Sequence, residues 1–148
     1  MSGFVTVTRE IRATRAQVAG FASLAANASQ WLWAPVQVAV INASRDMPDG
    51  TRQLINKDGD KLRDKVVSSD GECVVLHSEL RPRATDVPGR HLRYELTVTP
   101  GAGTAIATVD LGFVDAANPE GTVHQRRWRR HAEQCLARLA GACEVDAD

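Results

Sequence analysis

The first third of the chain changes from a strand pattern to a helical pattern of apolar positions. Residues 4–12 alternate between apolar and polar side chains, and their β-branched residues favour an extended strand. Helical spacing follows from about residue 15, after Thr14 as an N-cap with Gln17 three positions later, which is the pattern of a capping box. A second helical turn is expected over residues 29–32. The pattern therefore predicts one strand followed by two short helices.

The middle of the chain alternates again and is divided by turns. The segments "MPDGT", "KDGDK" and "SSDGE" each place Asp-Gly between extended runs, which is a strong local signal for a β-hairpin. Counted from alternation and turns, an antiparallel meander of about seven strands is expected. Besides the first strand, its alternating runs include residues 36–44, 73–80, 91–98 and 105–113.

The last part of the chain is helical. Asn118 can cap a helix and Pro119 suits its first turn, and the periodicity then continues for about six turns of roughly 3.6 residues. We expect residues 144–148 to be a frayed tail. The apolar stripe of the helix consists of Trp128, Ala132, Cys135, Leu136, Leu139 and Cys143.

Composition narrows the class of protein. The 148 residues suit a single domain, and 18 Lys and Arg balance 18 Asp and Glu, which leaves no overall positive field for nucleic acid or anionic lipid. The chain has no apolar run of signal-peptide or transmembrane type, so we expect a cytoplasmic protein. Its three cysteines, Cys73, Cys135 and Cys143, have no metal-ligand spacing. Reduced thiols and no structural zinc are expected.

The start of the final helix has unusual chemistry. In "TVHQRRWRRHAEQC", His124, Trp128, His131 and Cys135 share one helical face, whereas four arginines occupy the others. Such a segment is either a basic helix that binds nucleic acid or a lid whose inner face lines a site. The balanced charge of the chain argues against the first alternative.

The element order resembles a known superfamily. The stretch "IRATRAQVAGFASLAANASQWLWAPV" resembles the opening of START-like (SRPBCC) domains, in which a strand is followed by two small helices that end in tryptophan. The stretch "YELTVTPGAGTAIATVDLGFVD" looks like the paired late strands of the polyketide cyclase/dehydrase branch, where Gly-Thr follows the turn. The likeness covers nearly the whole chain but carries no catalytic signature.

The resemblance implies an α+β helix-grip fold over residues 1–148. In this fold a curved antiparallel sheet of about seven strands wraps around the long C-terminal helix, and two short helices after the first strand close one end. A cavity lies between sheet and helix. Members of the superfamily use it to carry lipids or hormones, or to fold and dehydrate polyketide chains, with no shared catalytic residues. Site residues must therefore be argued from geometry.

On this fold, three residues are candidates for catalysis: His124, His131 and Tyr94. A histidine can exchange protons near neutral pH, and a buried phenol can donate a hydrogen bond to a developing oxyanion. Together they suit an aldol cyclisation or dehydration, for which positioning of the chain supplies much of the acceleration. The expected substrate-binding residues are Trp128, Trp31, Trp33, Leu54, Asn56, Leu76, Ser78, Leu96 and Val98.

Each candidate has a structural alternative. His124 can bond to backbone in the first turn, His131 can be a satisfied core histidine, and Trp128 contributes burial before anything else. Cys135 is interpreted as packing, because the sequence supplies no fixed base beside it. His77 and His91 are expected to face solvent. The group Asp58, Asp60 and Asp64 lacks the twelfth-position glutamate of a calcium loop, and an Asp-Gly turn explains it.

Three functions follow from these observations. The first is a metal-independent polyketide cyclase or dehydratase that needs no cofactor and acts on a hydrophobic intermediate, free or tethered to a carrier. The second is a non-catalytic carrier of a lipid or small aromatic ligand, and the third is an interaction module with a filled core and an exposed apolar patch. A monomer or homodimer is expected, without nucleic acid as a partner and without membrane insertion.

Overall fold

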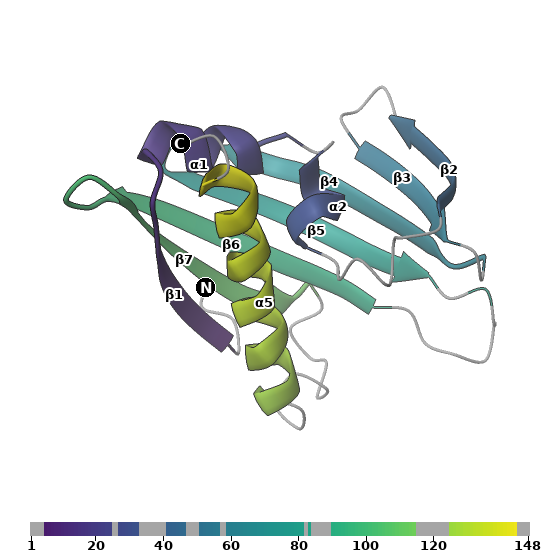
Figure 1. The fold of residues 1–148 in the computed structure, drawn as a ribbon. Coiled ribbons are helices and arrows are strands. Elements are labelled where there is room, and N and C mark those ends of the chain that lie inside the picture. The colour runs from purple at the N-terminus through teal and green to yellow at the C-terminus, as the bar shows by residue number, and fades with distance from the viewer. Residues whose placement is uncertain are drawn as a thin grey trace.

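The computed structural model describes residues 5–24, 27–32, 41–46, 51–56, 59–81, 83, 90–114 and 125–144, and for residues 28–29, 41–46, 51–54, 56 and 90 only the backbone. Figure 1 shows the elements that these residues form. In chain order they are β1 (Val5–Ile11), α1 (Arg15–Ala22), α2 (Ala28–Trp31), β2 (Ile41–Asp46), β3 (Thr51–Asn56), β4 (Lys61–Ser69), β5 (Cys73–Arg81), β6 (Arg90–Pro100), β7 (Ala105–Phe113) and α5 (Gln125–Glu144).

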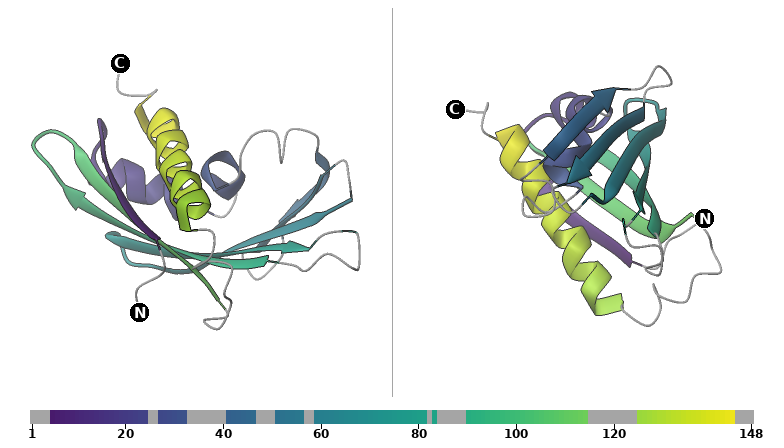
Figure 2. Two further views of the ribbon diagram at one scale, coloured as in Figure 1. Left: turned by 90° about the horizontal axis from the view of Figure 1, so that it is seen from below. Right: turned by 90° about the vertical axis from the view of Figure 1, so that its right-hand side faces the viewer.

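The strands form one antiparallel sheet in the order β1-β7-β6-β5-β4-β3-β2. The sheet is strongly curved, and the helices α1, α2 and α5 lie on its concave side (Figure 2). The long helix α5 packs against β1, β7, α1 and α2. The predicted α+β fold, in which a curved antiparallel sheet packs against a long C-terminal helix, is confirmed.

Alternation along the strands separates an apolar inner face from a polar outer face. Leu76, Tyr94 and Leu111 are paired across β5, β6 and β7 and are fully buried on the inner face. His77 and His91 lie on the outer face, where their rings meet edge to face at 5.5 Å and are half-buried. The prediction that these two histidines face away from the core is confirmed. An internal ligand site would therefore lie on the inner face of the sheet.

The Asp-Gly turns lie where the sequence placed them, as far as the structure describes them. Gly59 and Gly71 have φ angles of +83° and +89°, a conformation that glycine adopts without steric cost. Before Gly71, the Asp70 carboxylate accepts hydrogen bonds from the backbone N–H groups of Glu72 and Cys73. These bonds lower the pKa of Asp70. The "MPDG" segment and Asp58 lie outside the described residues.

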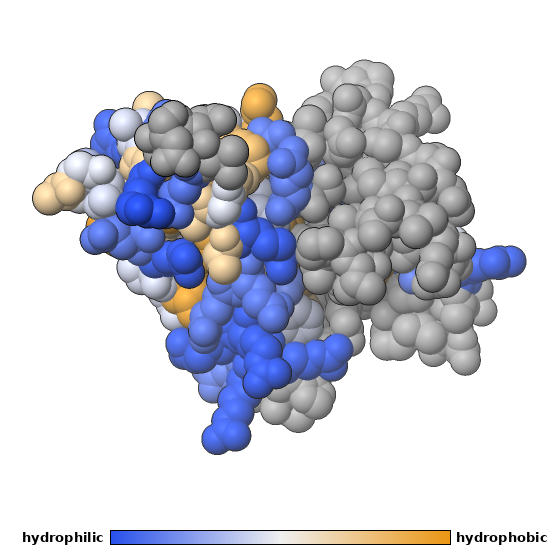
Figure 3. Space-filling model, viewed as in Figure 1, coloured by the Kyte–Doolittle hydropathy of each residue, from blue (hydrophilic) through white to orange (hydrophobic). Residues whose placement is uncertain are grey.

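The two well-described helices follow their sequence signals. Thr14 caps α1, and its capping box with Gln17 is complete. The predicted stripe of α5 is buried, whereas its arginines at 126, 127, 129 and 130 are exposed. In Figure 3 the surface at the lower end of α5 is strongly hydrophilic. The predicted cap at Asn118 and Pro119 lies outside the described residues. Glu144, predicted to begin the frayed tail, is instead the last residue of α5, where its carboxylate accepts the backbone N–H of Arg12.

Candidate functional site

The central contact of the site joins the sheet to the long helix. The hydroxyl oxygen of Tyr94, on β6, lies 2.9 Å from Nε2 of His131, on α5. Tyr94 is fully buried, whereas His131 keeps a partly exposed edge. Alternation turns Tyr94 to the inner face, and the helical period turns His131 toward it. Two residues predicted as catalytic are therefore in direct hydrogen-bond contact.

Aromatic rings surround this hydrogen bond. The Trp31 ring meets the Tyr94 ring at a centroid distance of 6.4 Å and an angle of 64°. On the other side, the Trp128 ring stands edge to face with His131 at 5.7 Å and with Phe113 at 5.6 Å. Trp31 and Trp128 are 0% and 5% exposed, so both exclude water from the pair. Both tryptophans were predicted to line the site, and the structure brings them to it.

Two further residues of α5 connect the pair to the end of α2. The Cys135 thiol donates to the carbonyl of Leu32 at 3.5 Å, and its sulfur lies 3.6 Å from Nε2 of His131. Arg138 donates from Nε to the carbonyl of Trp31 at 3.2 Å and from Nη2 to the Cys135 sulfur at 3.7 Å. The last carbonyls of a helix have no partner within it, so these contacts complete α2 and fix it against α5. Cys135 was interpreted as packing alone, and its polar contacts correct that interpretation.

Burial sets the protonation states of these groups. It lowers the pKa of His131 to about 4, assisted by the positive charge of Arg138, so the imidazole is neutral at physiological pH. Burial also raises the pKa of Tyr94 well above its usual value, with smaller contributions from Cys135 and Asp64. The pKa of Cys135 is raised to about 12 for the same reason. The site therefore contains a neutral imidazole, a phenol and a thiol, and no thiolate nucleophile.

A buried carboxylate lies on the same inner face. Asp64, on β4, is opposite Ser78, on β5, and both side chains are 0% exposed. The Ser78 hydroxyl donates to Oδ1 of Asp64. The interpretation of Asp64 as part of the Asp-Gly turn is wrong. Asp64 stands at every second position with Leu62 and Val66, and this alternation predicts that it shares their inner face.

The other predicted binding residues fall into two groups. Leu76, Leu96 and Val98 are fully buried on the inner face, as members of the hydrophobic core. His124 and Trp33 lie outside the described residues, and only the backbone of Leu54 and Asn56 is described, on β3. The catalytic or binding role of all these residues stays a prediction.

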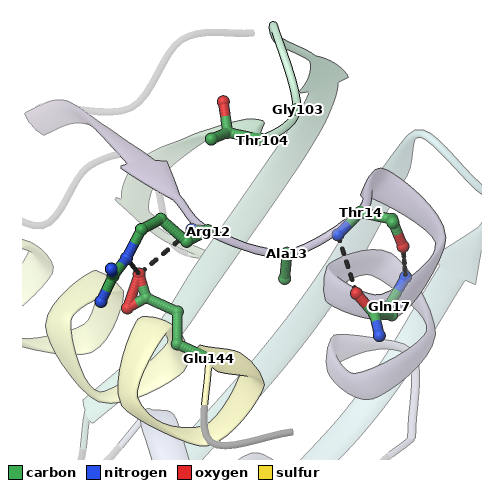
Figure 4. Close-up of a pocket in the computed structure, with 7 residues that line it drawn as sticks. All are labelled: Arg12, Ala13, Thr14, Gln17, Gly103, Thr104 and Glu144. Carbon is green, nitrogen blue, oxygen red and sulfur yellow. Dashed lines mark hydrogen bonds and ion pairs between the residues drawn. The ribbon is translucent and has the colours of Figure 1, made fainter. Parts of the chain in front are cut away.

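A surface pocket of about 460 Å³ lies at the far end of α5. As Figure 4 shows, its polar groups pair with one another: Arg12 with Glu144, and Thr14 with Gln17. None of the predicted site residues lines it. These two pairs complete the capping box of α1 and join the chain after β1 to the end of α5.

The described residues contain no group of three or more His, Cys, Asp and Glu side chains arranged to hold a metal ion. Within the same residues, no helix combines the length and apolar character required to cross a membrane.

Solved structures with the same fold have little sequence similarity to this chain. DynU16, a protein of the dynemicin biosynthetic locus, is 17% identical with a TM-score of 0.60, and the match covers 96% of this chain. The chain spans only 47% of DynU16, about half its length. Ms6760 from Mycobacterium smegmatis is 15% identical with a TM-score of 0.61, over 95% of this chain and 90% of that protein. MLL2253 from Mesorhizobium loti is 12% identical with a TM-score of 0.62, over 93% of both chains. At these identities the likeness shows the fold alone.

A comparison with curated protein sequences found no match. The family described as polyketide cyclase / dehydrase and lipid transport, in contrast, matches residues 4–144, nearly the whole chain. The match agrees with the strand order, the closing helix and the START-like sequence patterns at both ends of the chain. The protein therefore belongs to the polyketide cyclase / dehydrase and lipid transport family, within the START-like superfamily.

Proposed function

We propose that the protein is a polyketide cyclase or dehydratase that binds a hydrophobic, polyketide-like intermediate between the sheet and α5. His131 serves as general base and acid, and Tyr94 serves as hydrogen-bond donor to the substrate oxygen. The observation that carries the proposal is the 2.9 Å contact between these two side chains in the buried interior between the sheet and α5. The family match and the origin of DynU16 in a biosynthetic locus support the same class of reaction.

The buried surroundings explain why such a pair is chemically useful. Leu76, Leu96 and Val98 offer no hydrogen bonds, so a carbonyl oxygen brought to this region finds its polar partners at Tyr94 and His131. Sites of this type are mostly apolar, with few polar groups that fix the orientation of the ligand. We infer that a substrate approaches from the side of His131, which is the partly exposed member of the pair.

The proton transfers of an aldol cyclisation can be assigned to these two residues. A substrate carbonyl oxygen accepts the hydrogen bond of the Tyr94 hydroxyl, which frees the Nε2 lone pair of His131. Nε2 then removes a proton from the carbon beside that carbonyl, giving imidazolium and an enolate. The enolate carbon attacks a second carbonyl of the same chain, and the resulting alkoxide takes the proton back from His131. In a dehydration, the protonated imidazole instead supplies the proton with which the hydroxyl group leaves as water.

The low pKa of His131 makes it a stronger acid and a weaker base than an ordinary histidine. An imidazolium with a pKa of about 4 is a strong proton donor, which suits protonation of an alkoxide or a leaving hydroxyl. As a base it is weak, so the enolate needs stabilisation by hydrogen-bond donors aimed at its oxygen. Tyr94 is suited to this role because burial keeps it protonated.

Proton exchange on a simple aryl ketone tests the proposal without knowledge of the natural substrate. We expect the protein to accelerate exchange of the methyl protons of 2-acetylnaphthalene in D2O, followed by NMR. His131→Gln should reduce the enzyme-dependent rate by roughly 100-fold or more, the usual contribution of a general base. The dissociation constant of the probe should change by less than about threefold, because the lost interaction is made in the transition state.

The matched control is His91→Gln, which changes the same residue type on the outer face of the sheet. It should retain the wild-type exchange rate. Binding of the probe without accelerated exchange would contradict catalysis and identify the protein as a carrier. Equal small losses of rate and affinity in His131→Gln would show that this residue only shapes the site.

A further inference from the structure

Trp31 has a buried hydrogen-bond donor without an acceptor among the described residues. Its side chain is 0% exposed, and its indole Nε1 has no hydrogen-bond partner within the described part of the chain. A buried N–H group without an acceptor is costly, and buried polar groups in native proteins are nearly always paired. The position therefore needs an explanation beyond packing, since phenylalanine or leucine would fill an apolar site without that cost.

Two backbone carbonyls at this point have hydrogen-bond partners on α5. Its carbonyl accepts from Arg138 at 3.2 Å, and the next carbonyl, of Leu32, accepts from Cys135 at 3.5 Å. Leu32 itself is 0% exposed. These contacts hold the end of α2 in place, so the unused indole donor belongs to a fixed segment.

The unused donor lies beside the proposed reacting groups. The rings of Trp31 and Tyr94 are in edge contact, with centroids 6.4 Å apart, and the Tyr94 hydroxyl is bonded to His131 at 2.9 Å. An indole N–H can donate but cannot accept. Its natural complement is therefore an acceptor oxygen, which a ligand bound next to Tyr94 would supply.

We propose that the indole N–H of Trp31 and the hydroxyl of Tyr94 bind the same region of the ligand, with Trp31 donating to a carbonyl or enolate oxygen. This inference rests on the proposed function and specifies its substrate class. The site takes hydrophobic molecules that carry a ketone oxygen and discriminates against hydrocarbons of the same shape. A site with buried donors rejects analogues that lack the acceptor, because the donors are then left unpaired.

The Trp31 N–H, as a second hydrogen-bond donor beside Tyr94, would also compensate for the low basicity of His131. Since His131 is a weak base in its buried setting, the reaction depends on lowering the energy of the enolate. Two donors directed at one oxygen form an oxyanion hole, and each can contribute strongly in an environment without water. Trp31 is therefore a specificity-determining residue that also supports the proposed proton removal.

The test compares two probes of nearly equal shape, 2-acetylnaphthalene and 2-ethylnaphthalene, which differ in the ketone oxygen. Wild-type protein should bind the ketone more tightly. Replacing the Trp31 indole by benzothiophene, through site-specific incorporation of 3-benzothienylalanine, exchanges the N–H for sulfur and keeps the ring size. This replacement should reduce the ketone preference by about three- to tenfold, the value of one hydrogen bond. Affinity for the hydrocarbon should stay within about twofold of wild type, because packing is retained.

Trp31→Phe serves as the second variant. It also removes the N–H, and the ratio of the two affinities cancels any general loss of packing. A ratio that stays at the wild-type value in both variants would overturn the inference, as would a wild-type protein that binds both probes equally or binds neither. If the ratio is unchanged in both variants but wild type still catalyses proton exchange and His131→Gln does not, the proposed function stands and only the role of Trp31 is refuted.

Discussion

The Tyr94 hydroxyl and Nε2 of His131 lie 2.9 Å apart, although the residues are 37 positions apart in the chain. The contact exists because α5 crosses the concave face of the sheet and turns His131, beside its buried stripe, toward β6. Burial keeps the phenol protonated and the imidazole neutral.

His131 makes the stability of the protein depend on pH. Its pKa is about 4 in the folded protein, against roughly 6.5 in an unfolded chain. Between these values the unfolded chain binds a proton that the folded protein does not, so stability decreases as the pH falls. We expect the free energy of unfolding to lose up to about 3 kcal/mol from this residue between pH 6.5 and 4, with no further loss below pH 4.

Denaturant unfolding at a series of pH values checks this dependence. His131→Gln removes the titrating group, so the difference in unfolding free energy between variant and wild type should change steadily across that window. A constant difference from pH 7 to pH 4 would show that His131 binds its proton equally well in the folded and unfolded states.

The three cysteines should differ in reactivity. Cys135 and Cys143 are buried, and burial raises the pKa of Cys135 to about 12, whereas Cys73 is partly exposed. Thiolates are the reactive form, so a buried thiol of high pKa is inert. Titration with a disulfide reagent should label one thiol per chain in the native protein, at Cys73, and three in denaturant. Rapid native labelling of Cys135 would contradict the closed contact between α2 and α5.

Ser78 should matter more for stability than its size suggests. Its hydroxyl is the hydrogen-bond donor to the buried Asp64 carboxylate. Ser78→Ala removes this donor inside the core, and the loss of a buried hydrogen-bond partner costs about 1–3 kcal/mol. Ser68→Ala is the matched control, because Ser68 is exposed on β4 and its loss should cost less than about 0.5 kcal/mol. Equal effects of the two changes in denaturant unfolding would refute a structural role for the pair.

Periodicity in the sequence predicted much of the framework. The apolar stripe of α5 and the alternation of β6 were sufficient to place His131 and Tyr94 on facing surfaces. The capping box at Thr14 and the glycine turns after Asp58 and Asp70 depend on local interactions, which short segments encode directly. The packing of the curved sheet against the C-terminal helix was predicted from the family resemblance.

The parts that the sequence did not predict depend on contacts between distant segments. Cys135 gains its polar contacts from α2, whose position against α5 no local pattern encodes. Arg138 looks like one more surface arginine until α2 brings the Trp31 carbonyl to it. For Asp64, the alternation along β4 favours an inner-face position, whereas the nearby Asp-Gly turn favours a turn residue. The pairing of Asp64 with Ser78 distinguishes these two interpretations.

The pH dependence of proton exchange on 2-acetylnaphthalene tests the central claim most directly. If the neutral imidazole of His131 removes the proton, the enzyme-dependent rate should be constant above about pH 5.5, since its pKa lies near 4 and a base is fully active well above its pKa. The rate should fall to half its plateau value near pH 4, and His131→Gln should abolish the plateau. A midpoint near 6.5, or an unchanged profile in the variant, would contradict the account.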